Sequence, residues 1–155
     1  LLADVTKLGF ENFSFKLSSS KQNSDPIENL VDSGIKYIDF GMKNQNIISL
    51  MFDYPLPKSD YPELLLSANN AFAILQNRVK VLHKKDTSKN QLNSIALHAF
   101  THGLLNIIQM NERIDQGTKI STKDLAKTSD FYKASKKVKI NLRKLLKDFI
   151  KNLEF

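Results

Sequence analysis

The sequence of 155 residues contains no cysteine, only 5 glycines and 4 prolines, and no long uninterrupted apolar run. Without cysteine there is no disulfide framework, no thiolate nucleophile and no cysteine-based zinc site. The scarcity of glycine and proline excludes a Gly/Pro-rich low-complexity chain. The lack of a run of about 18 to 20 apolar residues excludes a membrane-spanning helix. The absence of cysteine fits a reducing compartment, and we expect a cytoplasmic protein.

The residues that are present favour one globular, helix-rich domain. With 41% hydrophobic and 25% charged residues, a chain of this length can bury a sizeable core. Apolar residues recur at helical spacing, and nowhere does alternation last long enough to indicate a strand. We therefore predict an all-α fold, a helical bundle in which residues 1–155 form a single domain.

Helix boundaries follow from capping residues and prolines. Apolar residues near a 3.6 period predict a helix over 1–20, and Asp25, Pro26 and Glu28 give an N-cap, a first-turn proline and a capping-box acid for a helix over 26–43. A short apolar stretch at 47–52 and a proline-rich loop at 54–62 follow. We then predict a helix over 62–84 and a helix over 89–111 that begins with a capping box of Ser88 and Gln91. A capping box of Ser121 and Asp124 opens the final helix.

The helix predicted over 89–111 is apolar on all sides instead of along one stripe. A helix of this kind must be buried all round. In a small bundle we expect it to pack on its own domain with one side and on a second subunit with the other. The apolar residues around its axis are Leu92, Ile95, Ala96, Leu97, Ala99, Phe100, Leu104, Leu105, Ile107, Ile108 and Met110.

The net charge of +7 belongs to the C-terminal quarter of the chain. Residues 118–155 contain 11 basic and 4 acidic residues, whereas residues 1–117 contain 12 of each. The asymmetry fits either a solvated lysine-rich helix face or an anionic partner, which would be nucleic acid or a membrane surface. The final helix is predicted to be amphipathic, with Val138, Leu142, Leu145, Leu146, Phe149 and Leu153 on one arc and Lys136, Arg143, Lys144, Lys147 and Lys151 opposite.

Two histidines, His98 and His102, are spaced i, i+4 and so share one helix face, as a two-ligand metal site requires. Ala99 stands where the HExxH motif has glutamate, and the candidates for a third ligand are Glu112 and His83, neither of which the spacing requires. Such histidines more often hydrogen-bond within the fold or serve as polar groups in a ligand cavity. We predict no metal site and no cofactor.

No catalytic motif stands out in the chain. Phosphate-loop, dinucleotide-binding and nucleophile-elbow glycine patterns are absent, as are a Ser/His/Asp order and paired carboxylates. We therefore expect no catalytic residues and no enzymatic activity. Gly103 lies in the middle of a helix at a cost of about 1 kcal/mol relative to alanine, which favours close packing of another backbone or a ligand.

Three segments carry a family resemblance. The stretch IALHAFTHGLL, residues 95–105, resembles the Trp-x-x-x-His-Gly helix of the WHG class of TetR-type transcriptional regulators, with His102 and Gly103 matching and His98 in place of tryptophan. Residues 34–52 are similar to the family's Y-x-x-F-A…P-x-x-x-x-L-M-F helix and turn, with Asn46 in place of proline. Residues 1–10 resemble the helix that follows the family's DNA-binding unit. The family-like core covers residues 1–112, and 118–155 form the basic C-terminal region.

The resemblance implies a ligand-binding and dimerisation domain with two partners, namely a hydrophobic small-molecule effector and a second copy of the chain. The family's helix-turn-helix, which contacts DNA, would precede Leu1 and is not in this chain. Effector binding in an apolar cavity changes the DNA affinity of such regulators. The pocket candidates are Phe40, Met51, Phe52, Phe72, Leu75, His98 and His102, and the dimer candidates are Phe100, Leu104, Ile107, Leu142, Leu145 and Phe149.

An alternative from another class is a free-standing helical interaction module. In that case the basic final helix would bind nucleic acid or an anionic membrane surface.

Overall fold

A computed structural model describes residues 1–19, 22–82, 87–117 and 119–153, and within these ranges the regular structure is entirely helical, which confirms the predicted all-α bundle. The elements are α1 (Leu2–Ser18), α2 (Pro26–Lys43), α3 (Gln45–Phe52), the 3-10 turn η1 (Lys58–Asp60), α4 (Pro62–Leu82), α5 (Thr87–Gly117), α6 (Thr122–Thr128), α7 (Asp130–Ser135) and α8 (Leu142–Lys151). None of the helices in the described ranges is long and apolar enough to cross a membrane.

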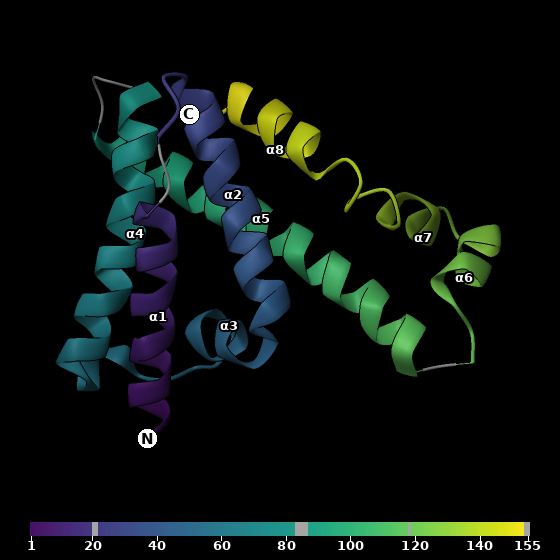
Figure 1. The fold of residues 1–155 in the computed structure, drawn as a ribbon, viewed down its shortest axis with the longest axis horizontal. Coiled ribbons are helices and arrows are strands. Elements are labelled where there is room, and N and C mark those ends of the chain that lie inside the picture. Colours follow the sequence, from purple (N-terminus) through teal and green to yellow (C-terminus); the bar gives the residue numbers. More distant parts are fainter. Residues whose placement is uncertain (20–21, 83–86, 118, 154–155) are drawn as a thin grey trace.

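The helices gather around α2. Figure 1 shows α1 and α4 side by side on one flank of α2 and α8 along the other, with the long helix α5 crossing the bundle. The far end of α5 extends away from the α1–α4 pair, and α6 and α7 lie beside that end (Figure 1). Leu30 on α2, Leu105 on α5 and Leu146 on α8 are completely buried. The core therefore lies where these three helices meet the α1–α4 pair.

Glycines on α2 set how closely its neighbours approach. A Cβ atom added at Gly34 would lie 2.8 Å from Cδ1 of Leu146, and one added at Gly41 would collide with Cδ2 of Leu105. The two glycines are seven residues apart and so occupy the same face of α2. Their missing side chains allow α8 and α5 to pack against the backbone of α2.

The start of α2 agrees with the prediction only in part. Asp25 is the N-cap and accepts a hydrogen bond from the Ile27 N–H at 2.9 Å, and Pro26 occupies the first turn. Glu28 does not complete a capping box. Its carboxylate instead accepts hydrogen bonds from Arg143 at 2.8 Å and from Lys147 at 2.6 Å, both on α8. A tertiary ion pair has replaced the local interaction that the sequence predicts.

The prediction of a single final helix after Ser121 is wrong. Ser121 does cap a helix, because its Oγ accepts from the Asp124 N–H at 3.2 Å, but that helix ends at Thr128, and α7 and α8 follow separately. Residues 136–141 form turns. This stretch contains three lysines and two β-branched residues, which disfavour a helix through charge repulsion and restricted rotamers. The break allows α8 to fold back onto α2.

Within this chain helix α5 is buried on one side and exposed on the other, and the expected contact of the exposed side with a second subunit stays a prediction. Leu92 and Ile95 are 58% and 55% exposed, and Ala99 and Gly103 on the same face are also exposed. A Cβ atom added at Gly103 would meet nothing within 4 Å. The close packing expected at Gly103 is therefore not made by the described part of its own chain. The helix also extends to Gly117, beyond the predicted end at 111.

Candidate functional site

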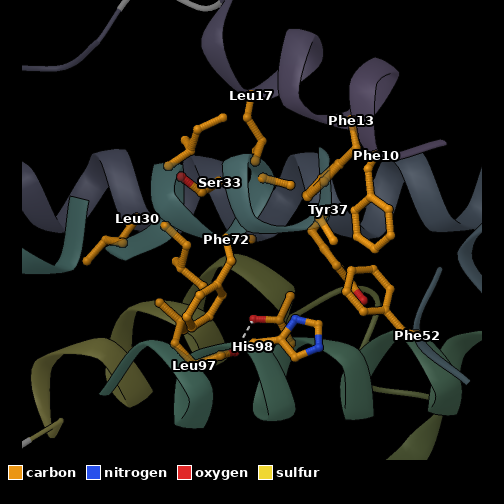
Figure 2. A pocket seen from close by; sticks show the side chains of 16 residues that line it. Phe10, Phe13, Leu17, Leu30, Ser33, Tyr37, Phe52, Phe72, Leu97 and His98 are labelled. Carbon is orange, nitrogen blue, oxygen red and sulfur yellow. Dashed lines mark hydrogen bonds between the residues drawn. The ribbon is translucent and has the colours of Figure 1, made fainter. Parts of the chain in front are cut away.

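An apolar cavity of about 80 Å³ lies inside the bundle. Helices α1, α2, α4 and α5 form its walls, and Phe52 at the end of α3 closes one side. Its described lining consists of Phe10, Phe13, Leu17, Leu30, Ser33, Gly34, Tyr37, Phe52, Ala68, Ala71, Phe72, Ile74, Leu75, Leu97, His98 and Thr101. Figure 2 shows Leu17, Leu30 and Ser33 toward one end of this cavity and Phe10, Tyr37 and Phe52 toward the other.

Small residues at helical spacing leave this space open. On α4, Ala68, Ala71 and Leu75 lie three and four residues apart and therefore share the face that meets the cavity. On α2, Ser33 also lines the cavity with a short side chain. Leucine or phenylalanine at these alanine and serine positions would fill the space, whereas the short side chains leave a void.

One end of the cavity carries a hydrogen-bonded chain of three side chains. The Tyr37 hydroxyl lies 2.7 Å from Nδ1 of His102, and Nε2 of His102 lies 2.8 Å from Oδ1 of Asp53. Burial raises the pKa of Tyr37, so the hydroxyl keeps its proton and donates to Nδ1. Nε2 of His102 then carries the ring proton and donates to Asp53. The chain runs from the buried Tyr37 to the half-exposed Asp53.

His98 lies next to this chain and lines the cavity. Its ring packs on Phe52 with a centroid separation of 4.7 Å and lies edge-on to Tyr37 at 5.6 Å. Burial, with a smaller effect from neighbouring His102, lowers the pKa of His98 from 6.5 to about 4. His98 is therefore a neutral imidazole near pH 7, which can both donate and accept a hydrogen bond to a cavity ligand.

The two histidines are not arranged as metal ligands. Both nitrogens of His102 are engaged by Tyr37 and Asp53, and Glu112 pairs with Lys139 at 3.3 Å. His83 lies outside the described residues. Over the ranges that the structure describes, no three His, Asp or Glu side chains gather as a metal ion requires.

At the opposite end of the cavity stands Arg78 of α4. Its NH2 group donates to the Leu17 carbonyl at 2.8 Å, and its NH1 group donates to Oγ of Ser33. Leu17 lies in the last turn of α1, where carbonyls lack partners within the helix. Arg78 therefore caps α1 and borders the cavity through two of its lining residues.

The structure brings four of the seven predicted pocket residues together in the cavity wall, namely Phe52, Phe72, Leu75 and His98. Phe40 and Met51 do not line this cavity, because both are buried in the surrounding core, 6% and 1% exposed. His102 does not line the cavity either. It contacts the wall through the hydroxyl of Tyr37.

Sequence reasoning missed Tyr37, Ser33 and Arg78. Ser33 interrupts the apolar stripe of the helix over 26–43, and a polar residue at an apolar position is a recognisable signal. Tyr37 belongs to the segment that carries the family resemblance, but an aromatic residue on an apolar face is typical of an ordinary core. No sequence signal marks Arg78 among the 23 basic residues.

The predicted dimer residues lie between α5 and α8 of the same chain. The rings of Phe100 and Phe149 stack with centroids 4.0 Å apart, and Leu104 is only 7% exposed. Leu142 and Leu145 are half-buried and pack against the core, and Ile107 is also half-buried. These residues contribute to the monomer, and their role in a dimer stays a prediction.

The basic face of α8 is partly neutralised by α2. Arg143 binds Glu28 at 2.8 Å and Asp32 at 2.5 Å, and Lys147 binds Glu28 at 2.6 Å. Two of the cations that would attract a nucleic acid or a membrane surface are thus engaged within the chain. This finding weighs against the interaction module.

Comparisons with protein-family models, with curated proteins and with solved structures find no match. We therefore infer the function from the cavity and its polar groups.

Proposed function

We propose that this chain is a ligand-sensing domain that binds an apolar small molecule in the cavity between α1, α2, α4 and α5. The observation that carries the proposal is the cavity itself: about 80 Å³, lined almost entirely by apolar side chains, with Tyr37 and His98 as polar groups on its wall. Binding sites for small molecules combine an apolar lining with a few placed polar groups in this way.

Within this proposal the chain is the regulatory part of a TetR-like transcriptional regulator. Support comes from the two longest segments that resemble that family, because they meet at the cavity: Tyr37 from the first hydrogen-bonds His102 from the second. A ligand that binds one arrangement of these helices better than another shifts the equilibrium between them. DNA would be contacted by a helix-turn-helix head, through which the shift would be transmitted.

The proposed regulator is a homodimer. The exposed apolar stripe of α5, which consists of Leu92, Ile95, Ala99 and Gly103, supports a contact with a second copy. An apolar stripe on a helix is normally covered by another surface. This stripe lies on a different face from the dimer candidates that the sequence indicates.

The binding proposal is tested by filling the cavity. Ala71 is 5% exposed and lines the cavity, so Ala71→Leu places additional methyl groups in the space that a ligand would occupy. The matched control is Asn69→Leu, which adds a similar side chain on the exposed side of the same helix. The measurement is the NMR shift of dissolved xenon, a small uncharged apolar probe of dry cavities, titrated with each protein.

We expect the wild type and Asn69→Leu to bind xenon with equal affinity and Ala71→Leu to bind it at least about tenfold more weakly, since about 1.4 kcal/mol corresponds to a factor of ten. Circular dichroism of each variant checks that the helices are intact. Equal binding by all three proteins would show that xenon does not enter the cavity and would overturn the proposal.

A further inference from the structure

Four polar side chains belong to the described lining of the apolar cavity, and three of them are already hydrogen-bonded within the chain. The hydroxyl of Tyr37 belongs to the hydrogen-bonded chain at one end of the cavity. Oγ1 of Thr101 donates to the Leu97 carbonyl at 2.7 Å. Oγ of Ser33 donates to the Asn29 carbonyl at 2.7 Å. Because a hydroxyl has a single proton, these three groups have no proton left to donate to a ligand.

His98 is the fourth polar group of the wall, and it forms no hydrogen bond with any residue that the structure describes. Figure 2 shows its ring among the lining side chains, and no dashed line ends on either of its nitrogens. A neutral imidazole has one N–H to donate and one bare nitrogen to accept, and such groups cost free energy when they stay unpaired in an apolar site. A molecule in the cavity that pairs with His98 would recover this free energy.

The wall of the cavity indicates an uncharged ligand. Its described lining contains no Lys, Arg, Asp or Glu, and His98 is neutral near pH 7 because burial lowers its pKa to about 4. Arg78 borders the cavity, but its NH1 and NH2 groups both donate within the chain. An ammonium or carboxylate group would lose its hydration in this space without gaining an opposite charge. We therefore exclude ionic ligands.

The volume of the cavity limits the ligand to a few atoms. A cavity of roughly 150 Å³ admits benzene, which corresponds to about 25 Å³ for each carbon atom. On the same scale the space of about 80 Å³ holds about three non-hydrogen atoms. A buried water needs about two to four polar partners, whereas His98 is the only polar side chain of the described lining without a hydrogen bond. A small alkyl group suits the rest of the wall better than water does.

We propose that the ligand is a short-chain alcohol of the size of ethanol, whose hydroxyl pairs with His98 and whose alkyl group lies against the apolar wall. The inference rests on the proposed function and adds the chemical class of the ligand. A hydroxyl both donates and accepts, so it can pair with either nitrogen of the imidazole. So few atoms limit the affinity, and the best Kd for a ligand of this size is on the order of 1 mM. The site therefore responds to millimolar alcohol.

The test is an NMR titration of the protein with a series of small molecules at millimolar concentrations. Methanol, ethanol and 1-butanol vary the length of the alkyl group, and acetonitrile has the size of ethanol but accepts hydrogen bonds without donating them. We expect the affinity to rise from methanol to ethanol, because more apolar surface is buried, and to fall for 1-butanol, which is too long for the cavity. Acetonitrile should bind more weakly than ethanol.

The nitrogen-15 resonances of the imidazoles report the hydrogen bond directly. Ethanol should shift a ring nitrogen of His98 in the wild-type protein, because the hydroxyl pairs with it. His102 is the internal control, since both of its nitrogens are engaged by Tyr37 and Asp53, and its resonances should stay where they are. This measurement needs no substitution and so does not depend on whether a variant folds.

His98→Phe tests the anchor, because it keeps a ring of similar size and removes both nitrogens. We expect it to weaken ethanol binding by about threefold to tenfold and to leave xenon binding within about twofold of the wild type. The matched control is Asn69→Phe on the exposed side of α4, which should change neither. Ala71→Leu should weaken both, since it fills the cavity, and unchanged ethanol binding by this variant would contradict the inference. If His98→Phe also loses xenon, its ring fills the space, and the nitrogen-15 shifts of the wild type decide.

The outcomes separate this inference from the proposed function. If xenon binds to the wild type and no alcohol does, the cavity binds apolar molecules and the alcohol class is wrong. The class is equally wrong if ethanol leaves the resonances of His98 unshifted, or if acetonitrile or 1-butanol binds more tightly than ethanol. If neither xenon nor any of these molecules binds, the proposed function itself is refuted, and this inference with it.

Discussion

Replacing His98 by phenylalanine should make the protein more resistant to mild acid. His98 packs between Phe52 and Tyr37 and is held as a neutral imidazole, with its pKa lowered to about 4 from 6.5. In the unfolded chain it takes up a proton at higher pH than in the fold. Between about pH 6.5 and pH 4 the unfolded state therefore binds more protons, and the free energy of unfolding falls as the pH falls.

The magnitude follows from the two pKa values of His98. A difference of one pKa unit corresponds to about 1.4 kcal/mol, so lowering the pH from about 7 to about 5 should cost the wild type about 2 kcal/mol through this group alone. Phenylalanine has a similar ring and no proton to bind. His98→Phe should therefore lose about 2 kcal/mol less than the wild type over the same range.

The assay is urea unfolding followed by far-UV circular dichroism, for both proteins at about pH 7 and about pH 5. The other titrating groups are common to both proteins, so their contributions cancel in the comparison. If the two proteins lost the same stability between these pH values, His98 would not be held neutral by burial, and the description of this end of the cavity would be wrong.

Further predictions concern packing, charge and assembly. Gly41→Ala should destabilise by about 1 to 3 kcal/mol in urea unfolding because its Cβ would collide with α5, whereas Gly103→Ala, with open space around it in the single chain, should stabilise the monomer by about 1 kcal/mol. Arg143→Gln should cost less than about 1 kcal/mol, since its ion pairs are exposed, and a loss above 2 kcal/mol would contradict this. Ile95→Glu should convert the proposed dimer to a monomer in light scattering. Leu66→Glu, which changes an exposed leucine on α4, should leave the dimer intact. A monomeric wild-type protein would refute the dimer.

The sequence predicts most of the helices because their ends are marked locally. Asp25 with Pro26, Ser121 and the prolines near Pro62 each fix a boundary through the backbone, and the structure places helix starts there. The predictions fail where distant residues decide. The break at 136–141 allows α8 to reach α2, and Glu28 leaves its predicted cap for cations 115 and 119 residues away.

The candidate site is less predictable because it depends on side chains from separate helices. Periodicity shows that Phe40, Met51 and Phe72 point inward, but it does not tell a cavity wall from a filled core. The void becomes visible only when short side chains from separate helices, such as Ala68 and Ala71 on α4 and Ser33 on α2, line the same space. For the same reason the sequence gives no sign of Arg78, whose position beside Ser33 and the Leu17 carbonyl arises from the meeting of three helices.

Gly103 connects the monomer to its proposed assembly. In the middle of an exposed helix face, glycine costs about 1 kcal/mol relative to alanine, and no atom lies within 4 Å of the position where its Cβ would be. Nothing that the structure describes in this chain offsets that cost, yet Leu92, Ile95 and Ala99 make the same face apolar. A second copy of α5 packed closely on this stripe would offset it. In that case Gly103→Ala would stabilise the monomer and weaken the dimer, whereas in a monomeric protein it would only stabilise.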